Sequence, residues 1–387
     1  MKVVVAPDAF AGLLTAPQAA AAIKAGWAQA APGDLLTTAA CSDGGPGFLE
    51  VLIDALGGTL LAVPVADPLG RLIQAEILIV ERDGRRTAYV EAAQAAGLHL
   101  LAPTERDPRV TSSYGVGQLL IAARGAGVDE IVIGIGGVAT TDAGAGALAA
   151  LGLGDPAVLG AGGLNLARVR PHDVSRVPEL AAQWAAVPLT IATDETTPLL
   201  GLTGTSATQA QGKGATPDGA QALEGALGHF ADVVRRAAPG PVDLLSNAAR
   251  RVDREPGAGA GGGLGYGLMV LGGRQRSAAD LVVASVGLPL LVAGADLVVT
   301  GTGCLDWSSL HGSVVSAVAE LALAAGTPTL AIAGTVLVGR REAMSVGLSG
   351  CYALLDPYDD DKDLIRDPAR VLRERAARVA ATWSRGR

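Results

Sequence analysis

Aromatic and charged side chains are both scarce in this sequence. Of its 387 residues, 3% are aromatic and 18% are charged. A core with so few rings must be packed mainly with Ala, Val, Leu and Ile, and hydrophobic residues make up 49% of the chain. The formal net charge is −8, and no stretch gathers Lys and Arg into a stripe. Because nucleic-acid-binding surfaces need such a stripe, the composition argues against a nucleic-acid partner.

Cysteine is also rare. Cys41, Cys304 and Cys351 are odd in number and stand at unrelated spacings, so they predict neither a disulfide framework nor a zinc site. The four histidines are scattered in the same way and lack the spacing of metal ligands. Free thiols are typical of a reducing compartment, and we therefore expect a cytoplasmic protein.

Long hydrophobic runs are missing. Only five apolar or neutral residues separate Lys2 from Asp8, which is too short for the core of a signal peptide. The longest uncharged stretch lies between Glu320 and Arg340 and contains Gly326-Thr327-Pro328. We expect this stretch to form a helix, a turn and a strand. The sequence therefore predicts no membrane-spanning segment.

The chain does contain a repeated order of strand, turn and helix. Its 53 glycines and 21 prolines fall between apolar runs, as expected for the tight turns of an α/β protein. Residues 2–6 predict a buried strand, and residues 15–30 predict a helix with Thr15 as N-cap and Pro17 in the first turn. Similar units follow and end in an amphipathic helix near residues 367–383. Such units predict mostly parallel sheets covered on both faces.

Chain length and a change of pattern predict two domains. Between residues 61 and 91, strand-like runs flank a turn at Asp83-Gly84, which predicts antiparallel hairpins. We place one domain boundary near residue 65 and a return near residues 255–265.

Five aspartates stand in glycine-rich loops that follow apolar runs or lie beside paired glycines. They are Asp8, Asp43, Asp142, Asp194 and Asp306. Glycine permits the close backbone approach that a phosphate cradle needs, and carboxylates can hold Mg²⁺ or accept a proton from a hydroxyl. This combination favours phosphoryl transfer. For any single loop, the Asp as the N-cap of the next helix remains an equal alternative.

The late loop, LVVTGTGCLDWSSLHGSVV at residues 297–315, has few of the charged side chains that a phosphoryl-transfer site needs. Its apolar run stops at Thr300, and we expect residues 301–303 to form a turn. Asp306 is the single carboxylate, and the segment contains no Lys, Arg or Glu. His311 lies in the same loop and is therefore a candidate for the site.

Two standard nucleotide-binding motifs are excluded. Residues 257–267 contain the Gly-x-Gly-x-x-Gly spacing, but they follow RVDREP, which is not a strand. We expect a glycine-rich helix start or closely packed backbone there instead. Residues 211–216, QGKGAT, look like the end of a P-loop but lack its first glycine and its Ser/Thr.

Taken in order, these loops resemble those of the glycerate kinase family of the bacterial two-domain type. The matching segments cover nearly the whole chain: KVVVAPDAFAGLLTA, SDGGPG, RDPRVTSSYGVGQLL, GIGGVATTDAGAGALAALG, IATDETTPLLG, AQGKGAT, EPGAGAGGGLGYGL and DLVVTGTGCLDWSSLHGSV. The resemblance implies phosphorylation of D-glycerate by ATP with Mg²⁺, typically at the 2-hydroxyl. It also implies two interleaved α/β domains. One is a Rossmann-like or flavodoxin-like domain of residues 1–65 and 265–387 with a mostly parallel sheet; the other is an inserted domain of residues 66–264 with a mixed sheet.

The resemblance further implies a role for each candidate residue. Catalysis falls to Asp194, which would orient the substrate hydroxyl, with Asp43 and Asp306. Substrate binding falls to Asp8, Ser42, Gly44, Gly45 and His311. Nucleotide and phosphate binding falls to Gly136, Gly137, Lys213, Gly259, Gly261 and Gly262. Mg²⁺ would be held by Asp142 and Asp194.

The sequence departs from the family where charge is expected. Lys is replaced by Ala11 and Ser313, Glu by Pro46 and Thr302, Arg by Cys304, and Asn by Thr141 and Thr197. The missing groups are those that would touch triphosphate, metal or carboxylate. Two interpretations therefore stay open: an active kinase for glycerate or a related hydroxy acid, and a degenerate relative that binds a small molecule without phosphoryl transfer. A nucleotide-dependent oxidoreductase is disfavoured because no strand precedes the needed glycine fingerprint. Whether the protein forms a homodimer also stays open.

Overall fold

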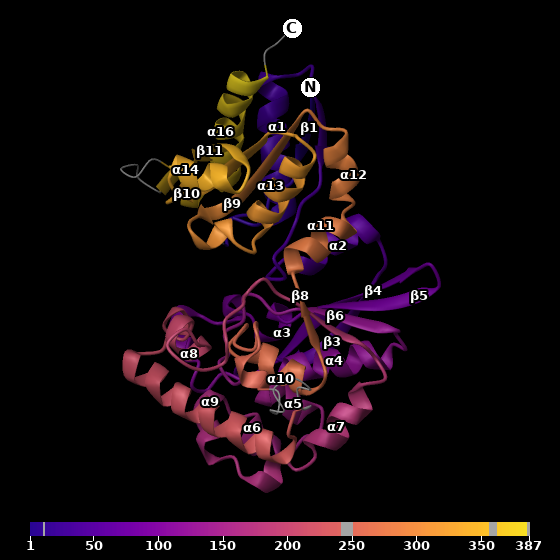
Figure 1. Ribbon diagram of the computed structural model, residues 1–387, viewed down its shortest axis with the longest axis vertical. Coiled ribbons are helices and arrows are strands. Elements are labelled where there is room, and N and C mark those ends of the chain that lie inside the picture. The colour runs from indigo at the N-terminus through magenta and orange to yellow at the C-terminus, as the bar shows by residue number, and fades with distance from the viewer. Residues whose placement is uncertain (11, 241–250, 356–361, 385–387) are drawn as a thin grey trace, which may run out of the picture. The chain divides into compact units, whose positions relative to one another are not determined.

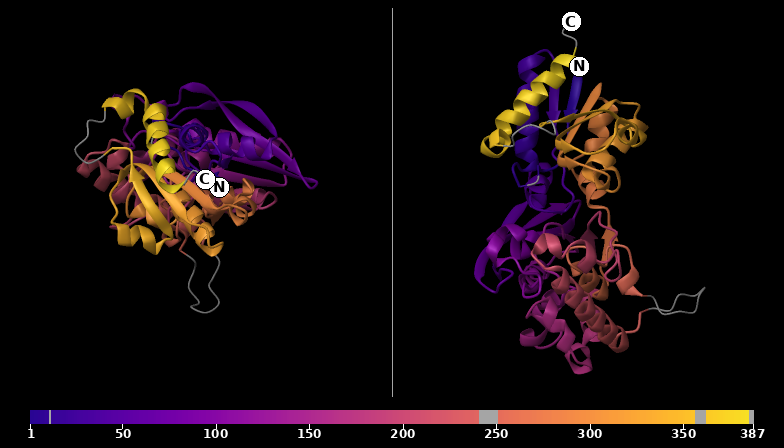
Figure 2. Two further views of the ribbon diagram at one scale, coloured as in Figure 1. Left: turned by 90° about the horizontal axis from the view of Figure 1, so that it is seen from above. Right: turned by 90° about the vertical axis from the view of Figure 1, so that its left-hand side faces the viewer.

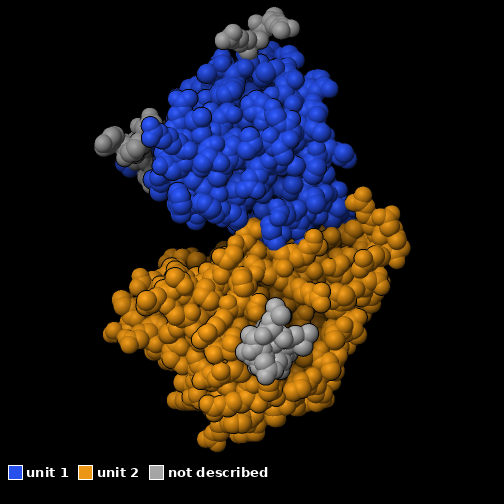
Figure 3. Space-filling model, viewed as in Figure 1, with its two compact units in different colours: residues 1–43, 50–57, 277–387 blue, residues 44–49, 58–276 orange. Residues whose placement is uncertain are grey.

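The computed structural model describes residues 1–10, 12–240, 251–355 and 362–384. The chain forms two compact units (Figure 3). The first consists of residues 1–43, 50–57 and 277–387, and the second of residues 44–49 and 58–276. Each unit contains its own β-sheet with helices, and the chain passes between the units several times. The predicted pair of interleaved α/β domains is therefore confirmed. The sequence-based boundaries between the two domains were placed near residues 65 and 265.

The first unit is built on a five-stranded sheet in the order β11-β10-β9-β1-β2 (Figure 1). All of its strand pairs are parallel, as the repeated strand–helix pattern predicts. The strands are β1 (Lys2–Val5), β2 (Leu35–Thr38), β9 (Leu297–Leu305), β10 (Thr329–Val336) and β11 (Leu348–Ala353). Because the strands are parallel, the segments that follow β1, β2 and β9 all leave the sheet at the same edge.

Strand β9 is longer than the sequence predicts. Residues 301–303 were expected to form a turn, but β9 continues to Leu305. The reason is its neighbour β10, because residues 301–305 pair with residues 332–336. Gly301 also lies against Phe10, where an added Cβ would be 3.1 Å from the ring atom Cζ. The glycine therefore serves close packing, and the late loop starts only at Asp306.

Helix α1 (Ala16–Ala30) begins where the sequence predicts. The side chain of Thr15 accepts a hydrogen bond from the Gln18 N–H, and the Gln18 side chain accepts one from the Thr15 N–H, which completes a capping box. The closing helix α16 (Pro368–Trp383) packs along α1 (Figure 2). Gly26 permits this approach, since an added Cβ would lie 2.0 Å from the Arg373 carbonyl oxygen.

The other helices of the first unit are α11 (Ala278–Ser285), α12 (Leu288–Ala293), η7 (Ser308–Leu310), α13 (Val314–Ala324), α14 (Arg340–Ser345) and α15 (Lys362–Arg366). Helix α2 (Phe48–Leu56) begins in the second unit and continues in the first, because the division falls after Leu49.

The second unit is built on a six-stranded mixed sheet in the order β3-β4-β5-β6-β7-β8. Strands β3, β4 and β5 are antiparallel, and β5 to β8 are parallel. The strands are β3 (Thr59–Ala66), β4 (Leu72–Arg82), β5 (Arg85–Glu91), β6 (Glu130–Gly134), β7 (Leu189–Ala192) and β8 (Arg274–Arg276). The predicted hairpin is confirmed: Asp83 and Gly84 both have positive φ, as a two-residue hairpin turn requires.

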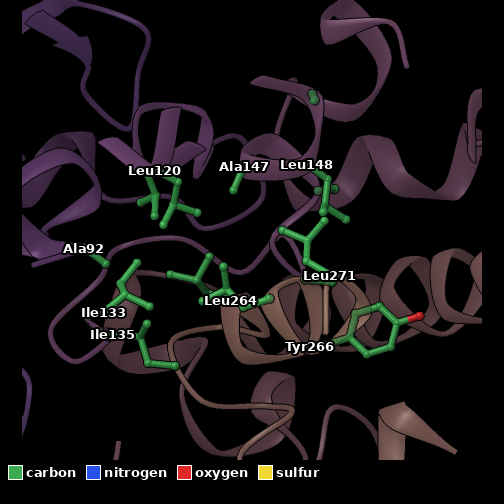
Figure 4. Close-up of a cluster of buried hydrophobic side chains, with 14 of the residues drawn as sticks. Ala92, Leu120, Ile133, Ile135, Ala147, Leu148, Leu264, Tyr266 and Leu271 are labelled. Atoms are coloured by element: carbon green, nitrogen blue, oxygen red, sulfur yellow. The ribbon is translucent and has the colours of Figure 1, made fainter. Parts of the chain in front are cut away.

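The core of the second unit joins its sheet to the surrounding helices. Figure 4 shows Ile133 of β6, Leu120 of α4 and Leu264 of α10 in one buried hydrophobic cluster. The α-helices of this unit are α3 (Ala93–Ala96), α4 (Tyr114–Gly125), α5 (Ala145–Ala150), α6 (Pro156–Leu159), α7 (Val177–Trp184), α8 (Thr205–Thr208), α9 (Pro217–Ala237) and α10 (Leu264–Val270). The 3₁₀ turns are η1 (Leu98–Leu100), η2 (Pro103–Glu105), η3 (Gly163–Arg168), η4 (Pro171–Val174), η5 (Gln211–Lys213) and η6 (Val252–Arg254).

Within the described residues, no helix is both long enough and apolar enough to span a bilayer. The three cysteines are free thiols, and Cys41 is fully buried.

Candidate active site

The predicted site residues are divided between the two units. The first unit holds Asp8, Ser42, Asp43, Asp306 and His311. The second holds Gly44, Gly45, Gly136, Gly137, Asp142, Asp194, Lys213, Gly259, Gly261 and Gly262. Ala11, where the resemblance implies Lys, lies outside the described residues.

In the first unit, three aspartates follow the carboxyl ends of parallel strands. Asp8 follows β1, Asp43 follows β2 and Asp306 follows β9. The Asp8 backbone N–H donates to the Gly301 carbonyl at 2.8 Å, which joins the first loop to β9. The Asp8 carboxylate accepts from the Ala9 N–H at 2.7 Å. The sheet therefore directs three carboxylates to one edge, the edge at which open α/β sheets bind ligands.

The Asp306 carboxylate is held by the turn that follows it. Its Oδ1 accepts from the Ser308 hydroxyl at 2.6 Å and from the Ser309 N–H and hydroxyl at 3.1 Å. Chiefly through the bond from Ser308, these contacts lower the pKa of Asp306. The carboxylate is thus ionised at neutral pH. It is not the N-cap of the next helix, since that position is Trp307 for η7 and Ser313 for α13.

Ser313, where the resemblance implies Lys, is the N-cap of helix α13 (Val314–Ala324). Its side chain accepts from the Ser316 N–H at 3.3 Å, and its own N–H donates to the Ser316 hydroxyl at 2.9 Å. The Ser313 hydroxyl also donates to the Ser309 carbonyl. A lysine at this position could not make this cap. The serine found here therefore stabilises the start of helix α13.

The parallel strands of the second unit also direct residues to one edge. Strand β5 ends at Glu91, β6 leads to Gly136, β7 leads to Asp194 and β8 ends at Arg276. Asp194 is half-buried directly beyond the buried Thr193. The role of orienting a substrate hydroxyl stays a prediction for this residue.

The paired glycines after β6 bring two loops into backbone contact. The Gly136 N–H donates to the Gly44 carbonyl at 3.1 Å. An added Cβ at Gly136 would lie 2.8 Å from Gly45 Cα, and one at Gly137 would lie 2.5 Å from Pro46 Cδ. The acidic glycine loop and the loop after β6 therefore form one tightly packed element.

The glycine-rich segment 257–263 is packed backbone, as the sequence predicts. The Gly259 N–H donates to the Thr197 carbonyl at 2.8 Å. Gly262 has a φ of 71°, and an added Cβ would lie 1.8 Å from the Thr140 carbonyl oxygen and 2.8 Å from the Lys213 ammonium. Side chains are excluded here because the chain passes against two other loops.

Lys213 is buried and directed into the protein. Its ammonium donates to the Thr140 carbonyl at 2.7 Å and to the Gln209 side-chain carbonyl at 3.3 Å. The same Gln209 oxygen accepts from the Gly262 N–H at 3.1 Å. Burial lowers the pKa of Lys213 to about 8, against a smaller upward effect of the Glu195 charge. In these contacts Lys213 joins the loops, and no phosphate is needed to explain its position.

Asp142 has a similar internal role. It is fully buried, and its Oδ2 accepts from the Ser113 N–H and hydroxyl, both at 2.8 Å. The N–H groups of Gly144 and Gly146 donate to the two carboxylate oxygens at 3.1 and 3.3 Å. Burial raises the pKa of Asp142, while these hydrogen bonds act in the opposite direction. A metal ion would have to displace bonds that hold helix α5 in place.

Two residues of this region are absent from the sequence-based prediction. Glu91 is buried at the end of β5, and its Oε2 accepts from the Gly47 and Leu49 N–H groups at the start of α2, both at 3.2 Å. Glu91 could have been found from the sequence, because it is an acid at the end of an apolar run, the pattern that identified Asp194. Gln209, which also donates to Glu195 at 2.8 Å, had no signal in the sequence.

No group of three or more His, Cys, Asp or Glu side chains forms a metal-binding cluster in the part of the chain that the structure describes. Within each unit, carboxylates stand at strand ends beside glycine-rich backbone. Such an arrangement can bind a ligand that brings its own metal ion, as magnesium nucleotides do.

Comparison with known proteins identifies the origin of these loops. The sequence profile described as "Glycerate kinase family" matches residues 3–384. A curated glycerate kinase from Halalkalibacterium halodurans is 35% identical over 393 residues, covering 99% of this chain and 99% of that protein. The glycerate 2-kinase of Escherichia coli K12 is 33% identical over 391 residues, covering 100% and 99%. An uncharacterized protein from Mycobacterium tuberculosis is 38% identical and covers 98% and 91%.

A solved structure shares the fold. It is a crystal structure from Salmonella typhimurium LT2, provisionally assigned as glycerate kinase 2. It superimposes with a TM-score of 0.73 at 33% identity, covering 99% of this chain and 98% of that one.

Proposed function

The chain belongs to the glycerate kinase family, and from this premise we propose that it transfers the γ-phosphoryl group of ATP to D-glycerate, at the 2-hydroxyl. The observation that carries the proposal is the family match over residues 3–384, together with relatives named glycerate kinase that align over almost their whole length. The parallel strand ends support it, because they direct carboxylates and glycine-rich backbone to the edges where ligands bind.

Asp194 is the residue that we assign to the substrate hydroxyl. It leaves strand β7 half-buried, so its carboxylate can reach a ligand while the sheet fixes its position. A carboxylate there would accept the hydroxyl proton as the oxygen attacks the γ-phosphorus, and ADP would leave with the electron pair of the broken P–O bond. Asp8, Asp43 and Asp306 are assigned to the orientation of substrate and nucleotide.

Mg²⁺ fits this site as a partner of the nucleotide. Protein-bound Mg²⁺ usually takes one or two carboxylates and completes its shell with phosphates and water. Asp194 is suited to be such a carboxylate. Asp142, the other predicted ligand, is committed to Ser113, Gly144 and Gly146, and we therefore assign it to the structure of the loop. The ion would supply positive charge to the phosphates at a site poor in Lys and Arg.

The first experiment is a coupled ADP-release assay with D-glycerate, ATP and Mg²⁺. Turnover is expected for the wild type and should fall by at least 10²-fold in Asp194→Asn, the usual scale for a lost acid–base group. Asp218→Asn, an exposed acid in the first turn of α9, is the matched control and should turn over normally. Activity that drops no more than a few-fold in Asp194→Asn would remove that residue from the proposed role.

The degenerate interpretation rests on the missing cations and makes a separate prediction. If the missing charged residues make the protein inactive, Thr302→Glu with Cys304→Arg should create or greatly raise kinase activity. Ala11→Lys with Ser313→Lys should raise that activity further. Ser313→Lys is introduced last, because it also removes the cap of α13 and costs about 1 kcal/mol of stability. If a folded wild type shows no turnover and the protein with all four changes is also inactive, the missing charges are not the whole cause of the inactivity.

A small-molecule substrate agrees with family membership. The cytoplasmic location, the homodimer and the absence of a nucleic-acid partner remain predictions from the sequence.

A further inference from the structure

The late loop carries two ring side chains, Trp307 and His311. Trp307 directly follows Asp306, and its side chain is 66% exposed. The ring of His311 packs against it with 5.0 Å between centroids and an angle of 44°. His311 Nδ1 also lies 3.2 Å from the Trp307 carbonyl oxygen. These two contacts hold His311 beside the indole, and most of the indole surface stays exposed.

A second exposed apolar residue comes from the neighbouring strand. Leu337 directly follows β10 and is 72% exposed. Its N–H donates to the Leu305 carbonyl at 2.8 Å, which places it beside the start of the loop that carries Trp307. An indole, an imidazole and an isobutyl group therefore follow the carboxyl ends of β9 and β10, the edge at which open α/β sheets bind ligands.

The side chains of this surface favour one of the three ligand parts that a glycerate kinase must bind: the glycerate, the triphosphate or the purine base. Glycerate is small, polar and anionic, and an exposed indole offers it neither a cation nor a set of donors. The triphosphate is a polyanion that requires Lys, Arg or metal ions, and the late loop contains neither Lys nor Arg. The purine base is the remaining part: it is uncharged and flat, and it stacks on aromatic side chains whatever its hydrogen-bonding pattern.

We propose that Trp307, supported by His311 and flanked by Leu337, is the stacking platform for the base of the nucleotide substrate. The inference rests on the proposed kinase function, since it assigns one subsite of that function. It also moves His311 from the substrate to the nucleotide side, as a residue that positions the indole. The loop contains no Lys or Arg and exposes an indole, and so binds the uncharged base of ATP.

The direct test is the fluorescence of Trp307. The other three tryptophans are less accessible: Trp27 and Trp184 are buried, and Trp383 is half-buried with its N–H donated to Tyr352. Excitation at the red edge of the indole band avoids absorption by nucleotides. We expect a non-hydrolysable ATP analogue with Mg²⁺, and adenosine at higher concentration, to quench the emission and to protect it from acrylamide. D-Glycerate and inorganic tripolyphosphate should do neither, and Trp307→Phe should abolish the signal.

Kinetics supply the second readout. Trp307→Ala should raise KM for ATP and for GTP alike by roughly 5- to 100-fold, since stacking tolerates either base. KM for glycerate and inhibition by tripolyphosphate, which has phosphates but no base, should change less than about twofold. Trp307→Phe keeps a ring and should recover most of the affinity, while His311→Ala should give a smaller rise in the same KM. Leu290→Ala, at an 85% exposed leucine of α12, is the matched control.

The outcomes separate the platform from the kinase function. Nucleotide quenching without turnover would support the platform and count against the proposed kinase activity. Turnover without quenching, with unchanged KM for ATP in Trp307→Ala, would overturn the platform and leave the kinase intact. Quenching by glycerate alone would move the loop to the acceptor side and overturn the proposal. So would protection of the indole that grows with protein concentration alone, because that result would assign the surface to a second copy of the chain.

Discussion

Replacing Lys213 with methionine should change how the stability of the protein depends on pH. The ammonium is buried and donates to the Thr140 carbonyl and the Gln209 side chain. Burial lowers its pKa from 10.5 to about 8, because an apolar environment disfavours the charged form; the Glu195 and Asp142 carboxylates offset only part of this effect. Methionine has a similar length and carries no proton, so it removes the titration and preserves most of the packing.

The sign and size of the effect follow from the two pKa values. The folded protein releases this proton near pH 8 and the unfolded chain near pH 10.5. Between these values the unfolded chain binds more protons, so stability rises with pH. The shift corresponds to a penalty of about 3 kcal/mol below pH 8 that disappears above pH 10.5. About 2 kcal/mol of it should be recovered between pH 7 and pH 9.5.

The assay compares thermal unfolding of wild type and Lys213→Met across that pH range at constant salt. All other titrating groups are common to both proteins and cancel in the difference between their Tm values. We expect wild type to gain roughly 4–8 °C relative to the variant. A difference that stays constant within about 1 °C would show that the ammonium is solvated in the folded protein, and the argument from burial would be refuted.

Further predictions concern single local contacts, each measured by urea unfolding. Thr15→Ala removes the cap of α1 and should cost about 1 kcal/mol; no loss would mean that the capping box does not form in solution. Gly262→Ala should cost on the order of 3 kcal/mol or more, since φ is 71° and the new Cβ would lie 1.8 Å from a carbonyl oxygen. Gly225→Ala, in the exposed middle of α9 with no atom within 4 Å of the new Cβ, should instead stabilise by roughly 0.5–1 kcal/mol. Equal effects at the two glycines would refute the packing argument.

The sequence predicts well what neighbouring residues decide. The cap at Thr15 depends on Gln18, three residues away, and the hairpin at Asp83-Gly84 depends on two residues that tolerate positive φ. The parallel sheets follow from repeated strand–helix units. The cap and the hairpin could be predicted because the interactions that produce them lie within a short stretch of chain.

Contacts between distant segments could not be predicted in this way. Residues 301–303 have the composition of a turn, but pairing with β10 keeps them extended. Lys213 was assigned to phosphate by resemblance, although its ammonium meets a carbonyl 73 residues earlier in the chain. Nothing near Trp307 in the sequence reveals that Leu337 stands beside its loop, because the two residues follow different strands, β9 and β10, which are joined by a helix.

The pairing of β1 with β9 has a consequence for synthesis on the ribosome. Strands β1 and β2 are made first, but β9 begins at Leu297, some 260 residues after β2 ends at Thr38. At about 5–20 residues per second, the nascent β1–β2 pair waits tens of seconds for its partner. A two-stranded ribbon is only marginally stable in water, so the KVVV edge stays open while the second unit emerges and folds. The first strand made is thus among the last to be secured, and the growing chain is most exposed to aggregation in that interval.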